Sequence, residues 1–220
     1  MCALASKWGE RRKIDLLMWD FLRAGGIFMF PLVLASVVGL TFIIERGLAL
    51  RWSKVIPPSV EDAANSFPLG SLEELKQVCE RDQSTFGRLL LVACEHLDHP
   101  REEAIDALQT QARREILQLE RGLVVLEIVV GIAPLLGLVG AIYGLIHLFG
   151  TLGAATTIES TVLAKGISEA LNTTLMGLLI AIPCLSAWSY YNKKVESLAV
   201  EMETLCDGFL RRMHRELQQP

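Results

Sequence analysis

Apolar residues gather in three long runs along the chain, and polar and apolar positions alternate with helical spacing between them. The runs cover residues 25–48, 123–149 and 166–192. Each is long enough to cross a hydrocarbon core of roughly 30 Å, which takes about 20 helical residues. The pattern therefore predicts an all-α membrane protein with three transmembrane helices.

A shorter helix of another kind is expected before the first run, over residues 1–24. Its apolar positions recur at intervals of three and four, next to a basic stretch; they are Ile14, Leu17, Met18, Phe21 and Leu22. One apolar stripe beside basic residues is typical of an amphipathic helix that lies in the membrane interface. No small-residue cleavage site follows, so we do not interpret this segment as a secretory signal.

Residues 49–122 form a polar segment in which we expect several helices. Pro57-Pro58 should end the first transmembrane helix, and Ser71 with Glu74 has the spacing of a capping box. Short helices are expected near residues 59–66, 71–81 and 84–97. From Arg101 onward no helix breaker is evident before the membrane.

Two apolar seams flank the second and third runs. One follows the approach to the second run (Ile105, Leu108, Ala112, Ile116, Leu119), and the other follows the third run (Val195, Leu198, Met202, Leu205, Phe209). Spacings of three and four predict helices that pack along one edge. We therefore expect the second and third helices to extend into the cytoplasm as a long antiparallel bundle, with residues 193–220 as a C-terminal helix.

The distribution of basic residues predicts the orientation. Residues 150–160 contain no Lys or Arg, whereas basic residues flank the other ends of the spans. The positive-inside rule then makes residues 150–165 a short periplasmic loop, with residues 49–122 and the C-terminus cytoplasmic and the N-terminus periplasmic. The basic N-terminal helix argues the other way, but an interfacial helix can hold its charges against either leaflet.

Composition excludes several other classes. The chain has 220 residues, 51% of them hydrophobic, with a mean hydropathy of +0.38, which is too apolar for an ordinary soluble domain. A net charge of −4 without a basic block gives little support to nucleic-acid binding. The five cysteines lack metal-ligand spacing, and no phosphate-binding loop or nucleophile elbow occurs. We expect no metal, no cofactor and no enzymatic activity.

The third run is unusually polar for a membrane helix. It carries Asn172, Thr173, Thr174 and Ser186, with Glu169 in its first turn. Polar groups at membrane depth must face protein or a wet cavity. This predicts either a lined path or a helix interface.

Small residues recur along the second and third runs with helical spacing. They are Ala133, Gly137, Ala141 and Gly144, with Gly140 in the same motif, and Gly166, Ala170, Thr174, Gly177 and Ala181. Small residues let helix backbones approach closely in lipid. Tight packing and a pore lining both explain the stripes, and the two interpretations are compatible.

Counting residues from the expected cytoplasmic ends gives pairs of equal depth in antiparallel neighbours. Pro134 comes level with Pro183, and Glu127 with Trp188, near the inner end. Level prolines could bend both helices together, or could be two unrelated kinks. Near the middle, Ala141 comes level with Thr174.

His147 comes level with Glu169 near the outer edge. Imidazole titrates near neutrality, so the pair is a candidate pH-sensitive gate. The alternative is two interfacial groups that contact headgroups and water.

These segments resemble the MotA/TolQ/ExbB family of bacterial inner-membrane ion-channel subunits over nearly the whole chain. The resemblance is strongest in Ala133-Pro-Leu-Leu-Gly-Leu-Val-Gly-Ala-Ile-Tyr-Gly144 and in the run from Gly166 to Pro183 with Tyr191-Asn192; Phe21-Leu-Arg-Ala-Gly-Gly26 and Ile44-Glu-Arg46 are also typical. Three spans favour the TolQ/ExbB branch over the four-span flagellar stator branch.

The resemblance implies a homopentamer in the inner membrane, with the second and third spans around a central pore. The pore would hold the single spans of two copies of a partner similar to TolR or ExbD, whose membrane Asp takes and releases the ion. The proton motive force would drive this partner. Thr174, Thr173, Ala141, Glu169 and His147 are the candidate pathway residues.

The sequence departs from the family pattern at Ala141, where Thr is usual after the second Gly. Losing one hydroxyl weakens the case for coordinating sodium and favours protons. It also keeps open a non-conducting scaffold or assembly subunit of the same architecture. A solute transporter has less support, because three spans without an internal repeat are few for such a fold.

Overall fold

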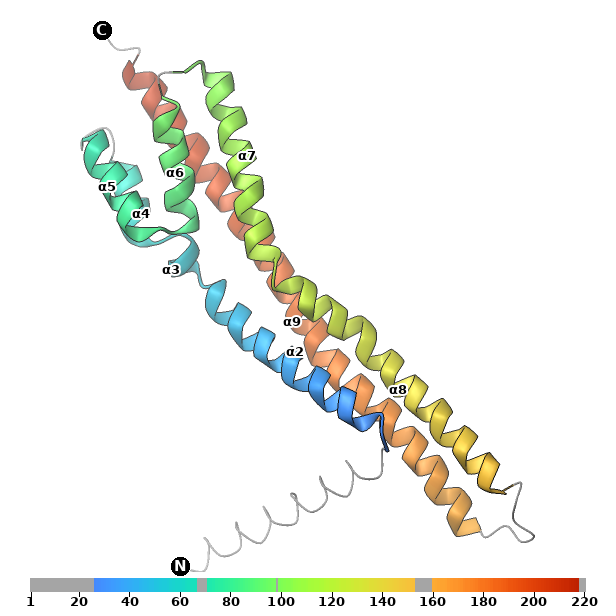
Figure 1. Ribbon diagram of the computed structural model, residues 1–220. Helices are drawn as coiled ribbons and strands as arrows, with labels where there is room; N and C mark the ends of the chain where they lie inside the picture. Colours follow the sequence, from blue (N-terminus) through green and yellow to red (C-terminus); the bar gives the residue numbers. More distant parts are fainter. Residues whose placement is uncertain (1–25, 67–70, 98, 153–159, 218–220) are drawn as a thin grey trace, which may run out of the picture. The chain divides into compact units, whose positions relative to one another are not determined.

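The computed structural model describes residues 26–66, 71–97, 99–152 and 160–217. Within these ranges the chain forms helices and no strand (Figure 1). The helices are α2 (Met29–Ala49), α3 (Trp52–Val55), α4 (Pro58–Ser66), α5 (Leu72–Asp82), α6 (Thr85–Glu95), α7 (Arg101–Glu120), α8 (Leu123–Leu152) and α9 (Ser160–Leu217). The interfacial helix expected over residues 1–24 lies outside the described residues.

Three helices of the described chain are long and apolar enough to cross a membrane. They are α2, α8 as far as Thr151, and α9 as far as Met213. The prediction of an all-helical protein with three candidate spans is therefore confirmed. Both α8 and α9 reach into the expected loop of residues 150–165, ending at Leu152 and beginning at Ser160.

The described helices divide into two units. The span unit comprises residues 26–42 and 125–187, and the core unit comprises residues 43–124 and 188–217, each taken without the gaps given above. The long helix α9 contributes to both units, because its 58 residues run without interruption through Pro183 (Figure 1).

The core unit is built on large buried apolar side chains. Phe86 of α6 and Phe209 of α9 are fully buried, together with Leu90, Leu198 and Met202. Burying each such side chain contributes roughly 1.5–3 kcal/mol. The seam expected after the third run (Val195 to Phe209) therefore lies in this core, and most of the seam expected on α7 packs against it (Ile105, Leu108, Ala112 and Leu119).

Helix α5 begins as the sequence predicts. The Ser71 hydroxyl accepts a hydrogen bond from the Glu74 amide at 3.2 Å, and the Ser71 amide donates to the Glu74 carboxylate at 3.3 Å. Its C-cap, Gln83, adopts a left-handed conformation with φ of 49°. The capping box is thus confirmed in full.

A buried ion pair joins α6 to α7 in the core unit. The Glu115 side chain is 1% exposed, and its carboxylate accepts from Arg88 Nε at 2.8 Å and from Gln111 Nε2 at 2.9 Å. Arg88 also donates to the Gln83 carbonyl, which ties it to the end of α5. The hydrogen bond to Glu115 raises the pKa of Arg88, so the guanidinium keeps its charge. A buried carboxylate needs such partners, since unpaired burial costs several kcal/mol.

Two helix breaks differ from the sequence expectation. The first span helix ends at Ala49 and not at Pro57, and α3 follows as a separate turn. The expected continuous helix from Arg101 into the membrane was wrong, because a turn at residues 121–122 separates α7 from α8. At this turn Arg46 Nη1 donates to the Leu119 carbonyl at 3.1 Å, and the Arg46 guanidinium packs on Gly122, where a Cβ would clash.

Candidate functional site

Helices α8 and α9 approach backbone to backbone in the span unit. A Cβ on Gly177 would lie 2.6 Å from the Ala133 carbonyl oxygen, and a Cβ on Gly137 would lie 2.8 Å from the Thr173 carbonyl oxygen. Such distances leave no room for a side chain at either position. A Cβ on Gly140 would lie 3.1 Å from the Thr173 side chain, and one on Gly144 would lie 3.5 Å from Ala170 Cβ. The four glycines singled out for close packing therefore all lie along this contact.

Both candidate threonines direct their hydroxyls at backbone carbonyls. Thr173 Oγ1 donates to the Ala170 carbonyl of its own helix at 2.8 Å, and Thr174 Oγ1 donates to the Gly137 carbonyl of α8 at 3.4 Å. Thr173 is 2% exposed, and Thr174 is half-buried. Thr173 thus lies in the contact between α8 and α9 of the single chain, and its place in a pathway stays a prediction.

The register of this contact differs from the one obtained by counting residues. Thr174 meets Gly137, about one helical turn before Ala141, the residue expected at its level. The pairing of Ala141 with Thr174 was therefore wrong by about one turn. Counting assumed that both helices start level, whereas the smallest residues decide where the backbones approach.

Ala141 is half-buried in α8. Pro134 and Pro183 both lie inside helices, α8 and α9 respectively, the first half-buried and the second exposed. A Cβ on Gly177 would lie 2.6 Å from the Ala133 carbonyl oxygen, so Pro134 comes level with the turn around Gly177, six residues before Pro183. The expected level pair of prolines was therefore wrong.

A hollow of about 230 Å³ lies at the end of the span unit where α8 ends and α9 begins. We call it the His147 hollow; it is lined by Gly144, His147, Leu148, Thr151, Val162, Lys165, Gly166 and Glu169. The expected pair of His147 and Glu169 therefore does line one site. The His147 ring is stacked on Tyr143, with centroids 6.5 Å apart and planes 4° from parallel.

The sequence interpretation missed Lys165, the third charged group in this hollow. Lys165 is four residues before Glu169, so both fall on the same face of α9. That spacing could have identified it, but Lys165 was counted with the expected loop. A Cβ on Gly166 would lie 2.6 Å from Leu148 Cδ1, so this glycine lets α9 approach α8 next to the charged groups.

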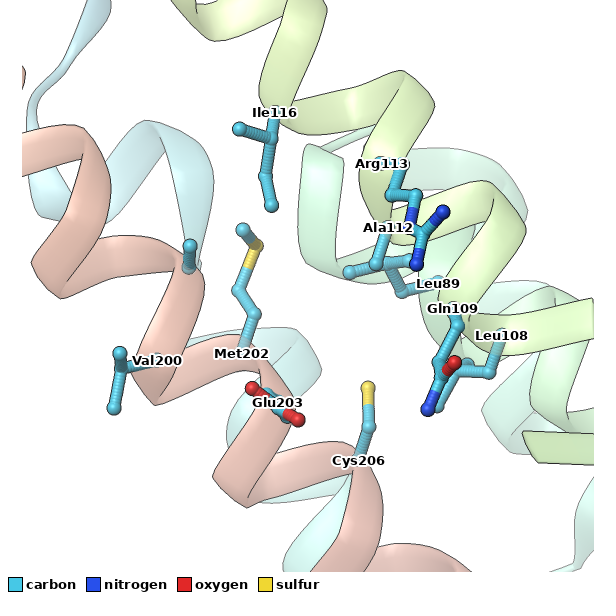
Figure 2. Close-up of a pocket in the computed structure, with 11 residues that line it drawn as sticks. Leu89, Leu108, Gln109, Ala112, Arg113, Ile116, Val200, Met202, Glu203 and Cys206 are labelled. Atoms are coloured by element: carbon cyan, nitrogen blue, oxygen red, sulfur yellow. The ribbon is translucent and has the colours of Figure 1, made fainter. Parts of the chain in front are cut away.

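A second hollow, of about 370 Å³, lies in the core unit (Figure 2). Its lining comes from α6, α7 and α9, and combines apolar side chains with Gln109, Arg113 and Glu203. Met202 points from α9 toward Ile116 of α7 (Figure 2). Burial raises the pKa of the Cys206 thiol, which lines this hollow, to about 12, so the thiol is protonated at neutral pH.

Acidic groups are scarce along the spans. Between Glu127 on α8 and Glu169 on α9, the described residues include no carboxylate. Among the described residues there is also no group of three or more His, Cys, Asp and Glu side chains that could hold a metal ion. The site therefore offers hydroxyls and backbone carbonyls at mid-span, and charged groups at its ends.

A family model described as the MotA/TolQ/ExbB proton channel family matches residues 81–204, more than half of the chain. That range includes α8, the described start of α9 and the Thr173–Thr174 pair.

Individual relatives agree with the family model. A putative biopolymer transport protein ExbB-like 1 from Synechocystis sp. is 37% identical over 174 residues, which is 76% of this chain and 66% of the relative. The chain thus spans just under two thirds of that protein. The Tol-Pal system protein TolQ of Pseudomonas aeruginosa is 27% identical over 219 residues, covering 91% of this chain and 94% of the relative. The chain belongs to the MotA/TolQ/ExbB proton channel family, in its TolQ/ExbB-like branch.

Proposed function

We propose that this chain is the proton-conducting subunit of an inner-membrane complex that uses the proton motive force to drive a partner protein. Membership of a proton channel family supports the proposal. The observation that carries it is the chemistry of the spans: the described residues between Glu127 and Glu169 include no carboxylate, and both threonine hydroxyls donate to backbone carbonyls.

The partner follows from that missing acid. A hydroxyl that donates to a carbonyl can still accept a hydrogen bond, but it is too weak a base to take up and release a proton near neutral pH. A single-span protein similar to TolR or ExbD, with an Asp at membrane depth, would supply the base. We propose two copies of this partner within a homopentamer, with the second and third spans of each subunit around the pore.

The candidate pathway runs along one side of α8 and α9. Glu169 and His147 form one end, and Thr174 and Thr173, with Ala141 nearby, form the middle. Protons suit this arrangement better than sodium, because sodium requires several oxygen ligands at once whereas a proton passes along water and single hydroxyls. We further propose that the N-terminus is periplasmic and the C-terminus cytoplasmic, as the positive-inside rule predicts.

Ion flux through the reconstituted complex tests the proposal. The full chain would be co-expressed with the single-span partner from its gene neighbourhood, and proton flux would be compared between wild type and Thr174→Val. We expect flux in the wild type and a loss of at least about tenfold in the variant, as for removal of one polar contact on a reaction path. Thr41→Val is the matched control, because Thr41 Oγ1 donates to the Val37 carbonyl at an exposed position of α2.

Each failure has a separate meaning. Absence of proton flux in the wild-type complex would reject conduction and favour the scaffold function, for which Ala141 is the supporting residue. Normal flux in Thr174→Val would leave the channel in place but remove Thr174 from its mechanism.

A further inference from the structure

The charges of the His147 hollow are few and can be assigned to their helices. α8 contributes His147, which is stacked on the Tyr143 ring, and α9 contributes Lys165 and Glu169. Residues 26–42 of the span unit, which include the first part of α2, carry no charged residue. Among the described residues of the hollow, Lys165 is therefore the one permanent positive charge.

Within the described part of the chain, Lys165 forms no ion pair with Glu169, the carboxylate of the hollow. A Lys placed four residues before a Glu also has the less favourable orientation for a helical pair. Lys165 is exposed and lines the same hollow as the half-buried Glu169, so the hollow contains a positive and a negative charge with no ion pair between them.

That balance has different consequences for protons and for metal cations. A sodium ion entering the hollow would need the Glu169 carboxylate and further oxygens such as Thr151 Oγ1, and would meet the ammonium group within the same 230 Å³. A fixed positive charge opposes the entry of any cation into a pore, and a sodium ion forms no covalent bond that would offset this repulsion. A proton needs no oxygen cage, since the imidazole or the carboxylate binds it covalently, one at a time.

We propose that Lys165 is a selectivity residue, whose charge keeps sodium out of the His147 hollow while His147 and Glu169 exchange protons. The inference rests on the proposed function and deepens it, because it assigns the choice of ion to a residue of this chain rather than to the partner. The charge of Lys165 also explains why the hollow would not hold a metal cation, although it contains the Glu169 carboxylate and the Thr151 hydroxyl.

The primary test measures ion selectivity. The complex, purified through a tag on the full chain, is reconstituted in liposomes, and sodium and proton fluxes are measured under the same potassium diffusion potential. The ratio of sodium to proton flux should rise at least about tenfold in Lys165→Met, as expected for removing one nearby charge. Lys165→Arg keeps the charge and should keep the wild-type ratio. An unchanged ratio in Lys165→Met would overturn the proposal.

A second measurement tests sodium binding in the hollow without measuring ion transport. Dicyclohexylcarbodiimide labels protonated carboxyl groups, and labelling of Glu169 is quantified by mass spectrometry in sodium chloride and in choline chloride. Sodium should protect Glu169 in Lys165→Met and not in the wild type or Lys165→Arg. Equal labelling in both salts for Lys165→Met would reject the selectivity role, whereas absence of proton flux in the wild type rejects the proposed function.

Discussion

The span unit and the core unit are both made of helices, yet they are held together by different groups. In the core unit large side chains such as Phe86 and Phe209 fill the interior. In the span unit the contact between α8 and α9 is made by Gly137, Gly177 and their neighbours, while large side chains such as Leu135 and Ile182, each 61% exposed, point away from it.

The difference follows from the two surroundings. Water drives apolar side chains together in a soluble core, but lipid tails are as apolar as leucine, so burying leucine between membrane helices gains little. Between membrane helices, the close approach of the backbones and its many dispersion contacts stabilise the packing instead. Substitutions that add a methyl group should therefore harm the span unit most, and substitutions that unpair a charge should harm the core unit most.

The largest effect is expected from Arg88→Ala in the core unit. The variant leaves the Glu115 carboxylate, 1% exposed, with Gln111 alone. We expect a loss of about 3 kcal/mol in the free energy of unfolding, at the low end for buried pairs because the Arg88 side chain is 38% exposed. Denaturant unfolding in detergent measures it. The control is Lys193→Ala, which removes an exposed pair with Glu196 and should leave the midpoint unchanged.

A smaller but specific effect is expected from Gly177→Ala in the span unit. The new Cβ would meet backbone atoms of α8, which cannot move aside as a flexible side chain could. We expect a loss of about 2 kcal/mol, typical of overpacking, measured by thermal unfolding in detergent. Gly131→Ala is the control, since a Cβ there has open space and alanine favours the helix. Equal stability of the two variants would contradict the packing comparison.

Tyr191→Phe should lower stability by about 1 kcal/mol, the usual contribution of one hydrogen bond. Tyr191 Oη donates to the Ile43 carbonyl at 2.8 Å, which joins α9 to α2 within the core unit. Tyr190→Phe should have no effect, because Tyr190 is exposed. Thermal unfolding of the two variants side by side checks both expectations, and a loss in Tyr190→Phe alone would contradict the assignment.

The last prediction concerns the buried thiols of the core unit, which should not affect stability at neutral pH but should lower it at alkaline pH. Burial raises the pKa of Cys79 to about 11 and of Cys94 and Cys206 to about 12, from 9.0. Above pH 9 the unfolded thiols ionise while the folded ones keep their protons, so their contribution to stability should be constant below pH 9 and be lost from pH 9 to about 12. Denaturant midpoints across this range measure the fall, which should be less steep in Cys206→Ala. A steep fall already at pH 7 to 8 would contradict burial as its cause.

Features that depend on neighbours in the chain could be predicted from the sequence. Long apolar runs predict the three candidate spans, and Ser71 with Glu74 predicts the start of α5, because each signal lies within one segment. The seam from Val195 to Phe209 likewise predicts the buried face of α9.

Features that depend on a side chain distant in the sequence could not be predicted. At the turn of residues 121–122 the contact is made by Arg46, which comes from another helix. Helix α7 carries several charged residues, and only the pairing with Arg88 of α6 explains why Glu115 is the buried one. The register of Thr174 against Gly137 depends on where the two helix backbones can approach each other, and counting residues gives no information on that. Lys165 was missed for a simpler reason, since α9 begins earlier than its apolar run.

The uninterrupted course of α9 has a consequence for how the sequence can change over time. Each residue turns an α-helix by about 100°, so a single insertion in the middle of α9 would rotate every residue after it by that angle about the helix axis. The turn at residues 121–122 already interrupts the helical path between α7 and α8, so an added residue there would rotate no continuous helix. Natural length variation among homologues should therefore accumulate at the junction of α7 and α8 and be excluded from the middle of α9.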